Sequence, residues 1–139
     1  MSVEETERMV REYLDVLLSG GDFASFFAED VLWTTMETGD QVRGRDAVRD
    51  FIVTLHSRWF DASPEIKNVT VADGVAALEA VFVGTHIGEF ADVAPTGVAV
   101  RLPYSVVYDV SDGKIDALRA YFPIMALVQQ LRDAAAVHA

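Results

Sequence analysis

The stretch VAALEAVFVGTHIGEFADVAPTGVAVRLPYSVVYDVSDGKIDALRAYF, residues 75–122, decides the fold. Its apolar and β-branched residues favour three long strands, separated by a Gly-, Pro- and Thr-rich loop and by the hairpin signal Asp112-Gly113. The predicted strands cover residues 75–86, 98–110 and 115–122. Strands longer than about ten residues are unusual and strongly curved, so we expect a curved antiparallel sheet.

Helices and two further strands are predicted around this stretch. Apolar residues recur at helical spacing after the capping-box pair Ser2 and Glu5. The predicted helices cover residues 2–19, 23–28 and 46–59, Pro123 opens a fourth, and the further strands cover 31–36 and 66–72. Residues 37–44 are expected to form a loop.

The order of these elements is helix, helix, strand, helix and then a run of antiparallel strands, which indicates an α+β fold. The length fits a single domain, residues 1–139. We expect helices to pack on one face of the curved sheet. Such a sheet encloses a cone with an apolar interior, a space of the kind that holds small ligands.

The amino-acid composition argues against two classes of binding partner. With 11 basic and 22 acidic residues the formal net charge is -11, so neither nucleic acid nor an anionic membrane is an expected partner. The absence of cysteine excludes disulfides and zinc–cysteine sites. The acidic start lacks a signal-peptide pattern, and no apolar run approaches the ~18 residues of a membrane span. A cytoplasmic location is therefore expected.

Six short motifs lie along nearly the whole chain. They are FAEDVLW (27–33), VRGRDAVRDF (42–51), GTHIGEF (84–90), APTG (94–97), VYDVSDGKI (107–115) and ALVQQL (126–131). Together they resemble the SnoaL-like polyketide cyclases of the NTF2-like superfamily, which are related to ketosteroid isomerase and limonene-epoxide hydrolase. The resemblance implies a conical fold, in which a curved mixed or antiparallel sheet wraps around N-terminal helices and a C-terminal helix follows. It also implies a hydrophobic pocket for a small carbonyl compound, no cofactor or metal, and a homodimer.

The catalytic carboxylates of these relatives have no counterpart in this sequence. By resemblance, the isomerases' general base falls at Thr35, their oxyanion-donating acid near Val106, and the cyclases' essential Asp at Pro123. None of these side chains is a base or acid at neutral pH. Four acids in loops near the expected cavity mouth are alternative bases: Glu37, Asp40, Glu89 and Asp92.

Two residues are the predicted catalysts. His86, in the GTH element, is the candidate proton acceptor and donor, because imidazole exchanges a proton near neutral pH. The alternative is a half-exposed histidine that hydrogen-bonds a nearby loop. Tyr13 matches the tyrosine that donates to the oxyanion in isomerase relatives, or else is a core aromatic of an amphipathic helix. His56, in the third predicted helix, is expected to be a core or mouth residue rather than a catalyst.

Strand alternation assigns the remaining pocket residues, because successive side chains face opposite sides of a sheet. Faces chosen by the resemblance place seven residues in the ligand-binding pocket: Trp33, Thr35, Phe82, Tyr104, Tyr108, Arg119 and Tyr121. In such a pocket Arg119 would be a buried charge that needs a carboxylate partner or an anionic ligand.

Two classes of function stay open. In the first, the protein binds a small hydrophobic carbonyl compound and catalyses its cofactor-free cyclisation or isomerisation by proton transfer. In the second, it is a non-catalytic ligand-binding or interaction protein that has lost the family's carboxylates.

Overall fold

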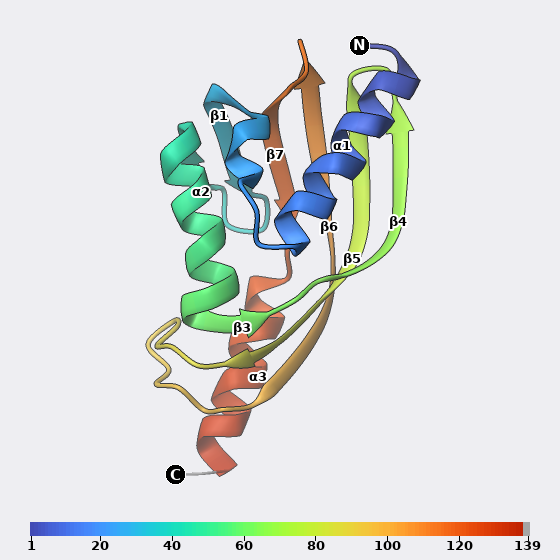
Figure 1. Cartoon of the computed structure of the whole chain (residues 1–139). Helices are drawn as coiled ribbons and strands as arrows, with labels where there is room; N and C mark the ends of the chain where they lie inside the picture. Colours follow the sequence, from blue (N-terminus) through green and yellow to red (C-terminus); the bar gives the residue numbers. More distant parts are fainter. Residues whose placement is uncertain (138–139) are drawn as a thin grey trace.

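The computed structural model describes residues 1–137 and arranges helices and a strongly curled sheet around an apolar interior (Figure 1). The helical elements are α1 (Val3–Leu18), the 3-10 turn η1 (Phe23–Phe26), α2 (Arg45–Val53), the π-helix η2 (Thr54–Trp59) and α3 (Ile124–Val137). The strands are β1 (Phe27–Thr35), β2 (Asp40–Arg43), β3 (Phe60–Ala62), β4 (Glu65–Ala72), β5 (Val75–His86), β6 (Ala99–Ser111) and β7 (Lys114–Tyr121). The α+β prediction is confirmed.

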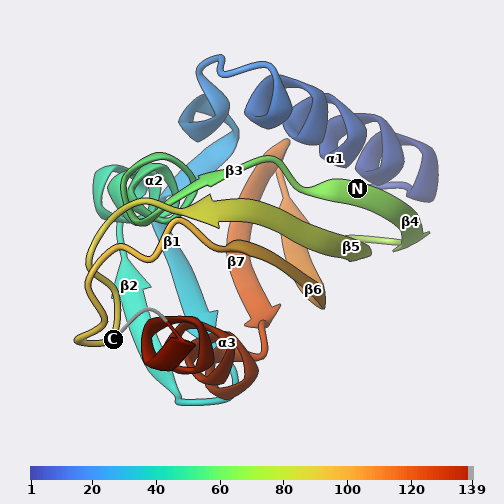
Figure 2. The same cartoon turned by 90° about the horizontal axis from the view of Figure 1, so that it is seen from below.

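The sheet follows the order β2-β1-β7-β6-β5-β3, and β4 also pairs with β5. It is mixed, because β1 runs parallel to β7 whereas the other pairs are antiparallel. Its longest strands, β5 and β6, have 12 and 13 residues and pair without a bulge from Val75 opposite Asp109 to Thr85 opposite Ala99. Seen from below, α1 and α2 lie together on one side of the curled sheet (Figure 2).

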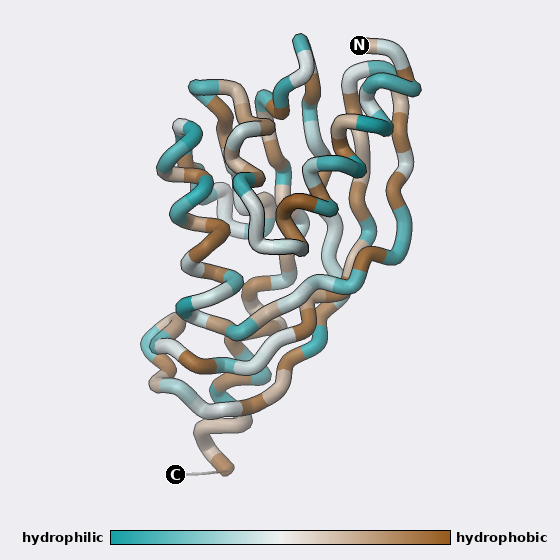
Figure 3. Tube along the Cα trace, in the orientation of Figure 1, coloured by the Kyte–Doolittle hydropathy of each residue, from teal (hydrophilic) through white to brown (hydrophobic). Residues whose placement is uncertain are grey.

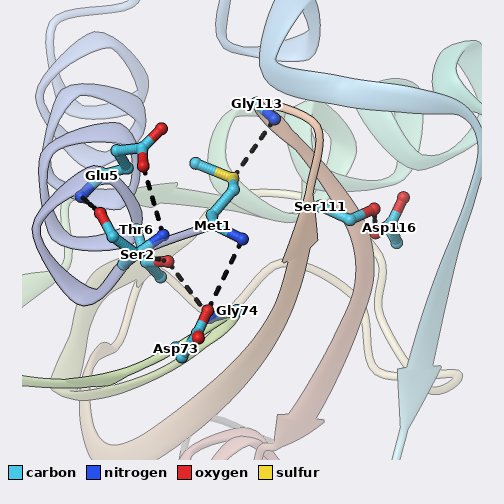
Figure 4. Close-up of polar contacts among 9 residues, drawn as sticks. All are labelled: Met1, Ser2, Glu5, Thr6, Asp73, Gly74, Ser111, Gly113 and Asp116. Atoms are coloured by element: carbon cyan, nitrogen blue, oxygen red, sulfur yellow. Dashed lines mark hydrogen bonds and ion pairs between the residues drawn. The ribbon is translucent and has the colours of Figure 1, made fainter.

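The first turn of α1 is fixed to the hairpin between β4 and β5 (Figure 4). Ser2 and Glu5 form the predicted capping box, with the Glu5 backbone N–H donating to the Ser2 hydroxyl at 3.1 Å. The buried Thr6 hydroxyl donates to the Ser2 carbonyl and accepts from the Gly74 backbone N–H at 3.2 Å. These contacts hold α1 across the sheet, so that its other end lies over the interior.

Apolar residues recur along one face of α1, polar residues interrupt the apolar ones along β6, and β5 is almost continuously apolar (Figure 3). On β5 and β6 the even-numbered residues are the more buried ones, apart from Tyr104, which is only half-buried. The inward face predicted for these two strands is therefore confirmed. One buried cluster lies beneath α1, and a second, with Phe60, Phe82 and Leu127, lies toward α3.

The predicted inward orientation of Arg119 and Tyr121 is wrong. The register of β6 and β7 shifts between the pairs Val110–Ile115 and Asp109–Ala117, so that one extra residue of β7 bulges out and the alternation changes. Arg119 is half-buried on the outer face, where its Nη2 donates to the Asp109 carboxylate at 3.0 Å. Tyr121 is 51% exposed.

Three short elements differ from the sequence-based prediction. The expected loop at 37–44 contains β2, whose four residues include a single half-buried apolar side chain and so carry no alternating pattern. Residues 60–62 form β3 beside β5. The predicted helix 46–59 has the right extent, but its last six residues, Thr54–Trp59, form a π-helix.

The loop after β5 packs directly on η2 through Gly88. The backbone N–H groups of Ile87 and Gly88 both donate to the Trp59 carbonyl, at 3.0 and 3.1 Å. A Cβ at Gly88 would lie 2.2 Å from the Arg58 carbonyl oxygen, a contact that backbone atoms cannot accommodate. Only glycine therefore allows this approach.

We expect Gly88→Ala to lower the free energy of unfolding by about 1–3 kcal/mol, because the new methyl group forces the loop away from η2. Urea denaturation of both proteins measures the difference. Glu89→Ala, at the next and exposed position, is the control and should stay within about 0.5 kcal/mol of wild type. Equal stabilities for Gly88→Ala and wild type would show that the loop does not need this contact.

Candidate functional site

A cavity of about 40 Å³ lies inside the cone, between α1, η2 and the concave face of the sheet. Its walls are mostly aliphatic and aromatic side chains. Leu18, at the end of α1, lines it and is 42% exposed, so the cavity approaches solvent there. We call it the inner cavity.

Three tyrosine hydroxyls are the main polar groups of the inner cavity. Tyr13 comes from α1, whereas Tyr104 and Tyr108 lie four residues apart on the same face of β6. The rings of Tyr13 and Tyr108 are 5.8 Å apart, and both residues are at most 2% exposed. Within the described part of the chain, the hydroxyls of these tyrosines form no hydrogen bond.

Burial sets the protonation of these hydroxyls. It raises the pKa of Tyr13, Tyr104 and Tyr108 above the usual value for tyrosine, and the neighbouring tyrosines raise the pKa of Tyr13 and Tyr108 further. All three therefore keep their protons and remain hydrogen-bond donors at neutral pH. A ligand oxygen in the inner cavity would meet donors that have no partner in the protein.

The imidazole of His56 lines the same cavity. Ile52, Leu55 and His56 all contribute to its wall, because their i, i+3, i+4 spacing puts them on one face of the helical segment formed by α2 and η2. The imidazole packs against the ring of Phe82, with 6.1 Å between ring centres. Burial lowers the pKa of His56 to about 4, so its imidazole is neutral at pH 7. The sequence predicts a core or mouth position for His56 and no catalytic role, and the structure places the residue on the wall of this cavity.

His86 does not line the inner cavity. It is fully buried at the end of β5, where its Nδ1 accepts from the Thr96 backbone N–H at 3.1 Å and its ring packs on Phe60. Its backbone N–H also donates to the Val98 carbonyl, and its carbonyl accepts from the Gly97 N–H. The backbone and the side chain of His86 therefore both hold the end of the following loop. The structure thus shows the loop contact that the sequence left as the alternative, with an imidazole that is buried rather than half-exposed.

The other predicted pocket residues divide between two spaces. Trp33, Phe82, Tyr104 and Tyr108 line the inner cavity. Thr35 accepts from the Trp33 indole N–H at 3.0 Å and lines an adjoining pocket of about 210 Å³, which we call the outer pocket. Both spaces share Trp33, Leu55 and Phe122, which form a partition between them.

Of the three positions that the resemblance assigns to carboxylates, Val106 lines the inner cavity and Thr35 the outer pocket, while Pro123 lines neither. Among the described residues, Asp40 is the only carboxylate on either space; it lies opposite Thr35 at the start of β2 and is exposed. Glu37 instead accepts from the Met125 backbone N–H at the start of α3. The described residues contain no cluster of His, Asp and Glu suited to a metal ion.

This arrangement defines a mostly apolar cavity with three neutral tyrosine donors and one neutral imidazole. Such donors can stabilise negative charge on an oxygen, and a neutral imidazole can accept a proton.

Within residues 1–137, no helix combines the length and the apolar character required to cross a membrane.

Comparison with known proteins places the chain in a family. Residues 7–131 match the family of the SnoaL-like polyketide cyclases, so the chain belongs to this family. A protein of Jannaschia sp. CCS1, described as a candidate SnoaL-like polyketide cyclase, shares the fold with a TM-score of 0.82 and 19% identity over 92% of each chain.

Other solved structures with the same fold carry different descriptions. AclR of Streptomyces galilaeus, a candidate hydroxylase, has a TM-score of 0.79 and 19% identity over 95% of this chain and 98% of its own. A candidate ketosteroid isomerase of Kribbella flavida has a TM-score of 0.67 and 23% identity over 87% of this chain and 79% of its own. The NTF2-like fold expected from the sequence motifs is therefore confirmed.

We expect His86→Ala to lower the free energy of unfolding by about 2–4 kcal/mol, because it leaves a cavity and an unpaired Thr96 N–H. His86→Asn keeps an acceptor near the position of Nδ1 and should lose less. Urea denaturation of the three proteins measures both effects. Equal losses for Ala and Asn would contradict a role for the Nδ1 hydrogen bond.

The neutral state of His56 predicts a pH-dependent stability. In the unfolded chain His56 titrates near the ordinary histidine pKa of 6.5, and in the folded protein its pKa is about 4, so the unfolded state binds the proton first as the pH falls. Between pH 7 and pH 5.5 this costs the folded state about 1 kcal/mol. Urea denaturation at the two pH values should show this loss in wild type and a smaller one in His56→Gln. A variant with the full wild-type loss would contradict a buried neutral His56.

Proposed function

We propose that this protein binds a small hydrophobic compound through a carbonyl oxygen and catalyses cofactor-free cyclisation or isomerisation by proton transfer at the adjacent carbon. One observation carries the proposal: three tyrosines, whose hydroxyls are protonated and have no partner among the described residues, line one mostly apolar cavity. The family supports the reaction class, since its members are described as cyclases.

The tyrosines fit the developing charge of such a reaction. Removing a proton next to a carbonyl group moves negative charge onto the carbonyl oxygen, and fixed donors in a water-poor site stabilise that charge most strongly. Because Tyr13 comes from α1 and Tyr108 from β6, with 5.8 Å between their ring centres, both hydroxyls can serve one ligand oxygen. No metal ion is needed for this stabilisation.

The size of the inner cavity limits how a ligand enters. At about 40 Å³ it has room for about three water molecules. A ring compound must therefore displace side chains, and the two nearest routes are the exposed Leu18 and the partition to the outer pocket. Opening the partition of Trp33, Leu55 and Phe122 would add the larger pocket to the smaller one.

A second candidate function is non-catalytic binding of the same class of ligand. It is favoured by the absence of a carboxylate from the wall of the inner cavity, as far as residues 1–137 show. Binding alone would use the tyrosine donors and leave the ligand's carbon–hydrogen bonds intact. Exchange of α-protons with solvent separates the two functions.

The tyrosine donors can be tested with 2-naphthol, whose oxygen has the position of the enol oxygen in a bicyclic ketone. Tyr13→Phe and Tyr108→Phe should each weaken binding roughly tenfold, since each removes one hydrogen bond to the ligand. Their free energies of unfolding should not fall, because neither hydroxyl has a protein partner. Fluorescence titration measures the dissociation constants.

Tyr121→Phe is the matched control, because it removes an exposed hydroxyl from the outer face of β7. It should bind 2-naphthol like wild type. Equal affinity of all three variants, or no binding by wild type, would rule out the proposed binding mode.

A further inference from the structure

We infer that His56, on the π-helix η2, is the group that accepts and returns the proton in the inner cavity. The inference rests on the proposed function, and it adds the base that the tyrosine donors require. It replaces a carboxylate with an imidazole and takes the role from His86, which lies elsewhere in the fold.

Position is the first argument. His56 and the three tyrosines line one cavity but come from separate elements, η2, α1 and β6. A ligand whose oxygen meets the tyrosines therefore has His56 on another wall of the same small space. The packing of the imidazole against Phe82 restricts its orientation.

Availability is the second argument. Within the described residues His56 makes no side-chain hydrogen bond, and burial, the cause of its lowered pKa, keeps the imidazole neutral. One ring nitrogen is then an acceptor at neutral pH. His86 also has a nitrogen without a partner, Nε2, but this residue does not line the inner cavity. The Asp40 carboxylate lies beyond the partition and is exposed to solvent.

Access to solvent is the third argument. His56 also lines an open groove between the end of α1 and α2, together with Leu17 and Ile52. The imidazole thus stands between this groove and the inner cavity. A proton taken from the ligand can exchange with water from the groove side before it is returned.

The proposed step balances without a further reactant. The carbon–hydrogen bond next to the carbonyl group breaks, its proton passes to the free nitrogen of His56, and its electron pair forms the carbon–carbon double bond of an enolate. The tyrosine hydroxyls hold the enolate oxygen. In isomerisation the imidazolium returns the proton to another carbon; in cyclisation the enolate carbon attacks a second carbonyl carbon, whose oxygen takes the proton.

The test measures binding and proton transfer separately. 2-Tetralone is the probe for transfer, and the replacement of its α-protons by deuterium in D₂O is followed by ¹H NMR. 2-Naphthol is the probe for binding, as above. His56→Gln and His56→Asn should slow the exchange above buffer background by about 100-fold or more, while the affinity for 2-naphthol changes less than threefold. The second substitution guards against a folding defect of the first.

Two control variants complete the test. Arg58→Gln changes an exposed side chain of the same π-helix, and it should exchange at the wild-type rate. Asp40→Asn removes the competing carboxylate and should also keep the wild-type rate.

Each other outcome has a defined meaning. If both His56 variants exchange α-protons at the wild-type rate, the inference is overturned and the proposed function stands. The same holds if only Asp40→Asn loses the exchange. If the His56 variants lose binding as much as exchange, His56 is a binding residue and the inference fails. If wild type binds 2-naphthol without exchange, both catalysis and the role of His56 are overturned; if it does not bind, the proposed function fails as well.

Discussion

The unbroken pairing of β5 with β6 is the constraint on which the rest of the structure depends. Because both strands are long, the ladder must twist and curl, and the curl creates the interior. At one end, the hairpin leading into β5 holds the first turn of α1 through Gly74. At the other end, His86 and Gly88 attach the following loop, which in turn packs on η2. The ladder thus positions both helical elements that face the inner cavity.

The inner cavity gathers polar side chains that form no hydrogen bond with the described residues. A buried hydroxyl without a partner costs free energy relative to an apolar group of the same shape. In the proposed binding mode, a ligand oxygen supplies the partner that the hydroxyls of Tyr13 and Tyr108 lack.

The sequence predicts most of the fold because its strongest signals are local. Capping at Ser2, helical spacing in α1 and the length of β5 and β6 each depend on a few neighbouring residues. The bulge in β7 does not, because the register of β6 and β7 decides it, and so the inward face predicted for that strand is wrong.

The site is harder to predict, because it too depends on contacts between elements that are distant in the sequence. Strand alternation correctly places Phe82, Tyr104 and Tyr108 on the interior face. It also places His86 there, but His86 is the last residue of β5 and lies away from the inner cavity. Alternation shows which face of the sheet a residue is on, but not how far along the strand the cavity extends. His56 shares a helix face with Ile52 and Leu55, but this spacing alone does not distinguish an imidazole that can react from one that packs in the core.

The partition formed by Trp33, Leu55 and Phe122 has a consequence for how such a site can diversify. None of these residues supplies a hydroxyl or an imidazole to the inner cavity, yet together they decide whether the two spaces act as one. Selectivity for ligand length and the capacity for proton chemistry therefore reside on different side chains. Substitutions in the partition can adapt the protein to longer or shorter molecules while the reacting groups stay in place.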